Sequence, residues 1–236
     1  GGARLCALLA AIEEIQALEK EGLLRVTRVA GASAGAIAAC LFAAGIDIAV
    51  VRSRIDGVPA REIRKLFPEP TLMNWPLFLR LARGRPMWKI DRLVPFLDSF
   101  FKSSGLHTLA DLKTRKGVEV LIVAANLTDG RKEIYRDGNI VSALLHSTGI
   151  PYFLRTWNKS GAPVIVDGGL CENLPYEELV TPTAEYGPVA GISFAPASRR
   201  EVTNIVQFSK ALLDTAIESS TELARRRIGE DLLLRT

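Results

Sequence analysis

The stretch RVTRVAGASAGAIAACLFAAG, residues 25–45, contains a strand, a sharp turn and a helix in direct succession. Valines alternate with other residues over residues 25–30, which predicts a short strand, and residues 34–44 have the composition of a buried helix that ends at Gly45. The connection consists of glycine, alanine and one serine, so the backbone can turn without side-chain clashes. A strand that leads straight into a helix is typical of α/β proteins.

Beyond this unit, helices and strands alternate along the chain. Apolar residues at helical spacing predict helices over residues 6–20, 140–147 and 205–227, with shorter helices between Pro and Gly breaks over residues 51–115. Short apolar runs predict strands over residues 118–125, 133–136, 163–166 and 189–194. We therefore expect one α/β domain over residues 1–236, with a mostly parallel central sheet and helices on both faces.

The composition is that of a folded globular protein with a slight excess of positive charge. Of the 236 residues, 48% are hydrophobic and 24% are charged, which excludes disordered and fibrous proteins. The net charge of +4 and the pI of about 9.1 slightly favour anionic partners such as phospholipid surfaces or nucleic acid, without deciding the matter alone. Cys6, Cys40 and Cys171 are odd in number and far apart, so we expect buried thiols in a reducing compartment.

Residues 29–46 carry no charge and include a GxxxG spacing at Gly31 and Gly35, which are features of a transmembrane helix. Eight of these 18 residues are alanine and three are glycine. Because large apolar side chains are few, insertion into a bilayer would be only weakly favourable, and the transmembrane interpretation fails. No signal peptide is visible, and we expect a cytoplasmic protein.

Ser33 lies at the centre of the turn, in the sequence Gly31-Ala32-Ser33-Ala34-Gly35. This GxSxG pattern is that of a nucleophile elbow, in which a strained strand-to-helix turn exposes a serine hydroxyl. The pentapeptide alone occurs by chance in roughly one chain in ten of this length, but its place between a predicted strand and a predicted helix is much rarer. The alternative is a close-packed Gly/Ala turn whose serine has no catalytic role.

A serine nucleophile needs a general base, and histidine is the usual one. His107 lies in the sequence SSGLHTLADL, where Thr108 or Ser104 resembles a helix cap, so a surface or capping role is expected. His146 lies on a helix expected to be buried, where a satisfied core histidine is more common than a catalytic one. Neither histidine lies in a loop after a strand, so a Ser-His-Asp triad is disfavoured.

Asp167 directly follows the apolar strand at residues 163–166. It therefore stands at the carboxyl end of a sheet strand, where open α/β sheets place their ligand sites. Gly168 and Gly169 let the backbone turn at once and approach its neighbours closely. An Asp-Gly-Gly turn at a strand end is also common without any function, and three other Asp-Gly pairs occur in the chain. Asp167 outranks them because it follows a continuous apolar run.

Together these motifs resemble those of the patatin-like phospholipases. That family has a GGGxR/K oxyanion loop, a GxSxG nucleophile and a DG[G/A] motif, and the matching residues here, in the same order, are Gly1-Gly2-Ala3-Arg4, residues 31–35 and Asp167-Gly168-Gly169. The stretches at residues 124–131, 146–154 and 167–175 match as well, so the resemblance spans nearly the whole chain. The first glycine of the family loop is absent, and Leu5 stands where a small residue is common.

The resemblance implies a lipid acyl hydrolase of the phospholipase A or lysophospholipase type, with a Ser-Asp dyad and no cofactor or metal ion. Ser33 would attack the ester carbonyl, and Asp167 would accept its proton as general base. The backbone N–H groups of Gly1, Gly2 and Ala3, with the helix that follows, would stabilise the oxyanion. Acyl transfer to another lipid, and a non-catalytic module that binds a lipid or phosphate, stay open as alternatives.

By the same resemblance, the partner is a phospholipid or another acyl lipid and not nucleic acid. Residues 71–85 combine aromatic, apolar and arginine residues, which fits a peripheral membrane contact or, more commonly, a core helix with its arginines in solvent. For the basic residues 225–227, solvent is the default expectation, and contact with a lipid headgroup or a further domain stays open. The strand that precedes the oxyanion loop in the family is missing, so we expect the full-length protein to begin before Gly1, and a further domain beyond Thr236 stays open.

Overall fold

The computed structural model describes residues 2–56, 83–86, 93–156, 161–180, 187–194, 202–228 and 233–235. Its centre is a four-stranded sheet, made of β1 (Arg28–Ala32), β2 (Glu119–Asn126), β3 (Arg131–Tyr135) and β4 (Ile165–Asp167). β1 runs parallel to β2, whereas β3 and β4 both run antiparallel to it. The sheet is therefore mixed, and the expectation of a mostly parallel sheet is wrong.

A short hairpin explains the direction of β3. Only four residues separate β2 from β3, and the side-chain oxygen of Asn126 accepts the N–H groups of Thr128 and Asp129 within this turn. Such a connection joins antiparallel strands, because a parallel neighbour needs a crossover of a dozen or more residues. The sequence pattern identifies both runs as strands but carries no information on their relative direction.

β1 and β4 lie end to end along one edge of β2. β1 pairs with the first five residues of β2, β4 with its last three and β3 with its last five. Since a strand has two edges and β3 occupies one of them, β1 and β4 share the other. The last residues of β1 and β4, Ala32 and Asp167, pair with consecutive residues of β2, Val123 and Ala124. The carboxyl ends of β1 and β4 therefore face each other, which places Ser33, directly after β1, next to Asp167 at the end of β4.

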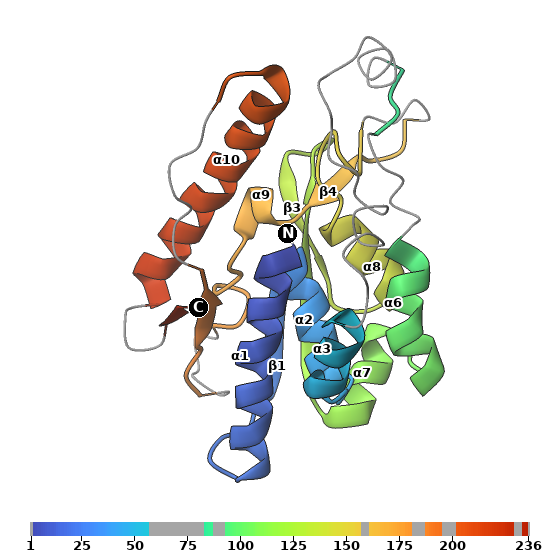
Figure 1. Cartoon of the computed structure of the whole chain (residues 1–236), viewed down its shortest axis with the longest axis vertical. Helices are drawn as coiled ribbons and strands as arrows, with labels where there is room; N and C mark the ends of the chain where they lie inside the picture. The colour runs from blue at the N-terminus through green and yellow to red at the C-terminus, as the bar shows by residue number, and fades with distance from the viewer. Residues whose placement is uncertain are drawn as a thin grey trace.

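Helices cover both faces of this sheet, as expected. They are α1 (Gly2–Lys20), α2 (Ala34–Ala43), α3 (Ile48–Asp56), α6 (Leu93–Phe101), α7 (Leu109–Lys116), α8 (Ile140–Ser147), α9 (Gly169–Glu172) and α10 (Ile205–Ile228), with a 3-10 turn at Lys102–Ser104. Figure 1 shows α9 and α10 on one side of the sheet and α6, α7 and α8 on the other. Along β2, Val120 and Ile122 belong to the core beside α2, and Leu121 and Val123, which point to the opposite face, are also buried.

A second, two-stranded sheet consists of β5 (Gly191–Ser193) and β6 (Leu233–Arg235), which run parallel. β5 lies within the strand predicted over residues 189–194. β6 was not predicted, because its three residues form no run long enough to be distinguished in the sequence.

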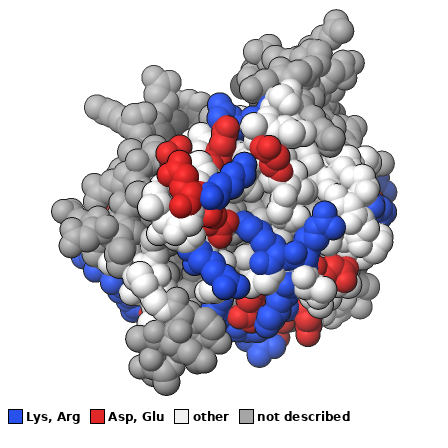
Figure 2. Space-filling view, turned by 90° about the horizontal axis from the view of Figure 1, so that it is seen from below, with Lys and Arg blue, Asp and Glu red and all other residues white. Residues whose placement is uncertain are grey.

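Basic side chains gather at one end of the molecule (Figure 2). α1 and α7 end with basic residues in their last turns, where the helix dipole favours cations. Lys116 of α7 pairs with Glu19 of α1 at 2.6 Å, and Arg28 at the start of β1 pairs with Glu119 at 3.0 Å. These two pairs neutralise part of this charge, which lies at the opposite end of β1 from Ser33.

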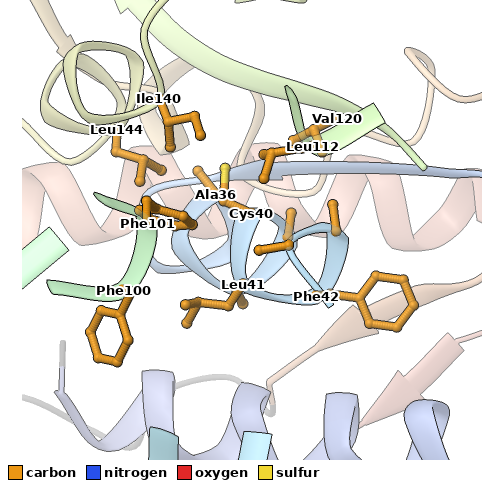
Figure 3. Close-up of a cluster of buried hydrophobic side chains, with 14 of the residues drawn as sticks. Ala36, Cys40, Leu41, Phe42, Phe100, Phe101, Leu112, Val120, Ile140 and Leu144 are labelled. Atoms are coloured by element: carbon orange, nitrogen blue, oxygen red, sulfur yellow. The ribbon is translucent and has the colours of Figure 1, made fainter. Parts of the chain in front are cut away.

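α2 packs in the centre of the hydrophobic core (Figure 3). Seven of its ten residues are buried, and its alanines allow close packing against the sheet and the neighbouring helices. The uncharged stretch at residues 29–46 is thus β1, a tight turn and a short core helix. Within the described ranges, no helix combines the length and apolar character needed to cross a bilayer.

The three free cysteines lie in different environments. Cys40 of α2 is completely buried, and burial raises the pKa of its thiol far above the usual range. Cys6 and Cys171 are exposed, so the expectation of buried thiols is wrong for these two. Cys6 lies near the start of α1, one turn before Leu9, which is the most buried position of that helix.

Candidate active site

Ser33 occupies the turn between β1 and α2 with φ 52° and ψ −122°. A positive φ costs free energy for any residue other than glycine, and the surrounding structure has to offset that cost. Gly31 makes the turn possible, since a Cβ atom on it would lie 2.3 Å from the carbonyl carbon of Gly35. A Cβ atom on Gly35 itself would have nothing within 4 Å. The turn thus has the geometry of a nucleophile elbow, and only one of its two glycines is needed to avoid a clash.

The hydroxyl group of Ser33 donates a hydrogen bond to Asp167, with 2.6 Å between Oγ and Oδ2. The other carboxylate oxygen, Oδ1, accepts the backbone N–H of Gly169 at 2.8 Å. Asp167 is 3% exposed, and burial raises the pKa of its carboxyl group to about 6, against the opposing effect of the two hydrogen bonds. Such a carboxylate is still ionised at neutral pH and is a stronger proton acceptor than an ordinary aspartate.

The backbone after Asp167 passes very close to β2. A Cβ atom on Gly168 would lie 2.0 Å from the carbonyl oxygen of Val123, so this position accepts only glycine. α9 begins at the next residue, Gly169. The Asp-Gly-Gly motif therefore lets β4 end directly against β2, where the carboxylate meets Ser33.

The residues predicted as the oxyanion loop lie at the start of α1. Gly2, Ala3 and Arg4 form the first turn of this helix, and Gly1 lies outside the described residues. N–H groups in the first turn of a helix have no acceptor within that helix, which suits them to bind an oxyanion. The role of these four residues stays a prediction.

A second set of N–H donors stands next to Ser33. Ala34 and Gly35 are the first two residues of α2, and their N–H groups have no acceptor in the part of the chain that the structure describes. They lie on the same turn as the nucleophile, at the positive end of a helix dipole.

Two further residues hold the site together and were not predicted. The Oγ of Ser147 accepts the N–H of Ser33 at 2.9 Å, and the carbonyl oxygen of Gly149 accepts the N–H of Asp167 at 3.1 Å. Both residues belong to the stretch at residues 146–154 that resembles the family. The sequence contains that signal but does not place the stretch beside Ser33.

Known proteins resemble this chain over most of its length. A family model described as Patatin-like phospholipase matches residues 1–180. The chain belongs to the patatin-like phospholipase family. It is 27% identical over 237 residues to Uncharacterized protein YqhO of Bacillus subtilis (strain 168), and the alignment covers 91% of this chain and 77% of that protein. VipD from Legionella pneumophila, a solved structure, matches 86% of this chain with 16% identity and a TM-score of 0.47, and the chain spans 50% of its length.

Neither of the two histidines of the chain contacts Ser33 in the part of the chain that the structure describes. His146 is half-buried, its Nδ1 lies 2.8 Å from the hydroxyl of Tyr135, and burial lowers the pKa of its imidazole. His107 is exposed and precedes Thr108, which is the N-cap of α7. His146 has a hydrogen-bond partner, as expected. Of the two predicted cap residues, Thr108 caps α7, whereas Ser104 belongs to the preceding 3-10 turn. Within the described ranges, the hydroxyl of Ser33 bonds to a carboxylate and to neither histidine.

A cavity of about 1000 Å³ opens beside Ser33 and Asp167. α1, β1, α2, β5, α10 and the loop after α8 form its walls. Its apolar lining includes Leu8, Ile12, Phe42, Phe153, Leu213 and Ile217. A cavity with these walls accepts an apolar chain next to the serine hydroxyl.

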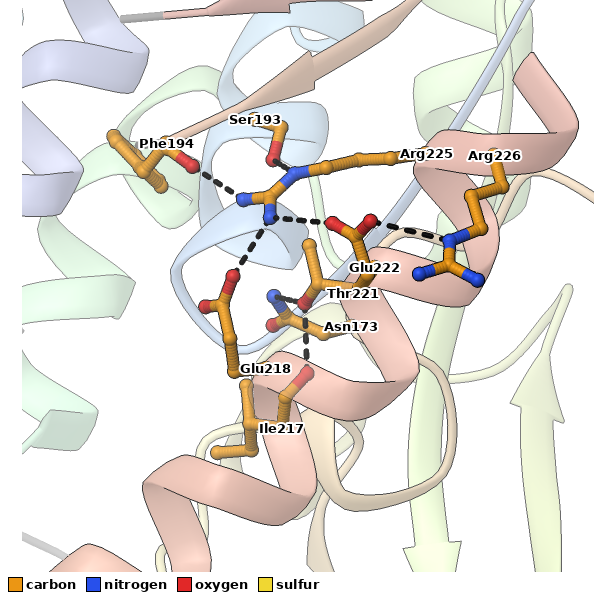
Figure 4. Close-up of polar contacts among 9 residues, drawn as sticks. All are labelled: Asn173, Ser193, Phe194, Ile217, Glu218, Thr221, Glu222, Arg225 and Arg226. Atoms are coloured by element: carbon orange, nitrogen blue, oxygen red, sulfur yellow. Dashed lines mark hydrogen bonds and ion pairs between the residues drawn. The ribbon is translucent and has the colours of Figure 1, made fainter. Parts of the chain in front are cut away.

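Arg225 fastens α10 to β5 at the wall of this cavity (Figure 4). Its Nε donates to the Oγ of Ser193 at 2.9 Å, and its terminal nitrogens bind the carbonyl oxygen of Phe194 and the carboxylate of Glu218, the latter at 2.7 Å. Only 8% of Arg225 is exposed, so the expectation that the three arginines at the end of α10 face solvent is wrong for this one. The guanidinium group satisfies several acceptors at once, which is why burial is tolerated.

Proposed function

We propose that the protein is a lipid acyl hydrolase that cleaves fatty-acyl esters through a Ser33-Asp167 dyad. The observation that carries this proposal is the 2.6 Å hydrogen bond from the hydroxyl of a strained elbow serine to a buried carboxylate. A base within hydrogen-bond reach of the nucleophile is the geometric requirement for nucleophilic catalysis. Membership of the patatin-like phospholipase family supports the same chemistry.

In the first step, Ser33 Oγ forms a bond to the ester carbonyl carbon while its proton passes to Oδ2 of Asp167. The electron pair of the C=O double bond moves to the oxygen, and the oxyanion is bound by N–H groups. We assign these donors to the predicted oxyanion loop at residues 1–4 and to the first turn of α2. Prealigned N–H dipoles of this kind usually give the largest part of the rate enhancement in acyl transfer.

In the second step, the tetrahedral intermediate collapses and its C–O bond to the alcohol breaks. The leaving alcohol takes the proton from Asp167, and the acyl group stays on Ser33. A water molecule then attacks the acyl-enzyme, with Asp167 accepting a proton from it, and collapse releases the fatty acid and restores the hydroxyl of Ser33.

The cavity beside the dyad supports an acyl-lipid substrate. Its apolar walls can hold a hydrocarbon chain, while the ester reaches Ser33 at the end of β1. We propose a phospholipid or another acyl lipid, met by peripheral contact with a membrane. The membrane contact considered for residues 71–85 stays a prediction, because residues 57–82 lie outside the described residues.

The test is hydrolysis of a lipid panel by the wild-type protein, with Ser33→Ala and Asp167→Asn beside it. We expect release of fatty acid by the wild type, with a loss of at least about 1000-fold in either variant because the two residues act as a unit. Asp137→Asn is the matched control, since Asp137 belongs to another Asp-Gly pair, is exposed and should leave activity unchanged.

A fluorophosphonate probe gives an independent readout of the same nucleophile. We expect one label per chain, on Ser33, and none in Ser33→Ala. Near-normal lipid turnover by Ser33→Ala, or absence of labelling and turnover in the wild type, contradicts the proposal. Addition of an acceptor alcohol to the assay separates hydrolysis from acyl transfer, because transfer yields a new ester in place of free fatty acid.

A further inference from the structure

Ser147, the last residue of α8, is completely buried at the junction of β1, β2 and β4. Its Oγ accepts the backbone N–H of Ser33 at 2.9 Å and donates to the carbonyl oxygen of Val123 at 2.6 Å. Val123 is the residue of β2 that pairs with Ala32, the last residue of β1. One hydroxyl group therefore connects the nucleophile turn to the central strand.

Backbone carbonyl groups of the same segment bind the residues that carry the general base. The carbonyl oxygen of Ser147 accepts the N–H of Gly168 at 3.2 Å, and that of Gly149 accepts the N–H of Asp167 at 3.1 Å. The end of α8 thus contacts both strand ends that meet along β2. The distance between the nucleophile and its base depends on this shared support.

The backbone of Ser33 needs such support. With φ at 52°, it lies outside the regions that residues with a side chain favour, and it stays there only where contacts fix it. Its N–H group points to the Ser147 hydroxyl, which is itself held by the bond that it donates to Val123. A hydroxyl group can accept and donate at once, whereas an alanine at this position can do neither.

We infer that Ser147 is a positioning residue for the nucleophile, and this inference rests on the proposed function. Its hydroxyl group fixes the backbone of Ser33 so that Oγ meets both Oδ2 of Asp167 and the ester carbonyl carbon. Ser147 takes no proton and does not touch the substrate. Its removal therefore changes the rate of the chemical step more than substrate binding.

The experiment compares Ser147→Ala and Ser147→Thr with a matched control, Thr148→Val. Thr148 is the next residue, is also buried, and its hydroxyl donates only within α8, to the carbonyl oxygen of Leu144 at 2.8 Å. Rates are divided by the number of active sites that a fluorophosphonate labels after long exposure, so that unfolded molecules are not counted. Thermal unfolding is measured for each variant.

We expect kcat per labelled site to fall by about 10- to 100-fold in Ser147→Ala, as is typical when a reacting group is misplaced by a fraction of an ångström, with KM changed by less than about twofold. The initial rate of labelling should fall by the same factor. Ser147→Thr keeps the hydroxyl group, and its activity should return to within about fivefold of the wild type. Thr148→Val should keep the wild-type kcat per site, even where it lowers the unfolding temperature.

A kcat per site in Ser147→Ala equal to that of the wild type overturns the inference and leaves the proposed function intact. A loss in Ser147→Ala that is matched by Thr148→Val also overturns it, because that loss would belong to the stability of α8. If Ser147→Ala does not fold, Ser147→Thr decides alone: a loss of activity per site of more than about fivefold, with Thr148→Val unchanged, counts against the hydroxyl. A wild type that is not labelled at Ser33 removes the proposed function and this inference together.

Discussion

Ser33 and Asp167 are 134 positions apart in the chain, and their side chains meet at 2.6 Å because β1 and β4 end head to head on one edge of β2. The two strands arrive from opposite directions. The mixed sheet therefore builds the site. If β4 ran parallel to β1 on that edge, Asp167 would lie at the end of β4 that is farther from Ser33. The ends of both strands are then fixed by α8, through Ser147 and Gly149.

The raised pKa of Asp167 predicts how activity depends on pH. The carboxyl group must be ionised to accept the proton of Ser33, and its pKa is raised to about 6 by burial. We expect kcat/KM to be constant well above pH 6 and to fall about tenfold per unit below it. A pH-rate profile with a soluble short-chain ester measures this, and full activity at pH 5 contradicts it. Asp137→Asn should give the same profile as the wild type.

The same carboxylate reduces the stability of the folded protein. A group whose pKa rises from 3.8 to about 6 on folding takes up a proton between these values, so the protein gains stability as the pH falls through 6 and has the full penalty above it. We expect Asp167→Asn, which is neutral, to raise the free energy of unfolding at pH 8 by about 3 kcal/mol. Denaturant unfolding at pH 8 and pH 5 should show the difference shrinking to about half. A variant less stable than the wild type at pH 8 excludes this account.

The two glycines of the GxSxG motif should respond differently to the same change. In Gly31→Ala, the new methyl carbon meets the backbone of Gly35 at 2.3 Å, and we expect a loss of more than about 2 kcal/mol in the free energy of unfolding. In Gly35→Ala, the methyl group meets nothing within 4 Å, and alanine is the better helix former, so stability should rise by up to about 1 kcal/mol.

Thermal unfolding of both variants checks this difference, and equal destabilisation of the two contradicts it. Gly35 lines the cavity beside Ser33, so its methyl group should raise KM for bulky esters while the protein stays folded. Activity and stability therefore separate in Gly35→Ala and fall together in Gly31→Ala.

Local patterns were sufficient to predict the elements that carry the dyad. α8 spans the predicted residues 140–147, where Asn139 caps its first turn. β1 was predicted too early, over residues 25–30, because Gly31 and Ala32 have the composition of a turn, yet they pair with Ile122 and Val123 of β2. Because α2 packs closely against β1, these two positions of the strand need small residues, which propensity alone assigns to a loop.

Contacts between segments that are far apart in the chain could not be predicted from the sequence. The position of Asp167 at a strand end indicated a ligand site, but the direction of β4 depends on its pairing with β2, which no local pattern records. Ser147 resembles any serine at a helix end until the fold places it beside Ser33. The burial of Arg225 likewise depends on acceptors at the end of β5 and directly after it, Ser193 and Phe194, 32 and 31 positions away in the chain.

Arg225 and Arg226 are neighbours on α10 that should differ sharply on substitution. The side chain of Arg225 is 8% exposed and binds Ser193 and Glu218, whereas that of Arg226 is 76% exposed and pairs with Glu222. We expect Arg225→Met to lower the free energy of unfolding by about 2 to 4 kcal/mol, because buried acceptors lose their donor, and Arg226→Met to change it by less than about 0.5 kcal/mol. Denaturant unfolding compares the two variants directly. Equal effects would mean that the buried contacts with β5 add nothing beyond an exposed ion pair.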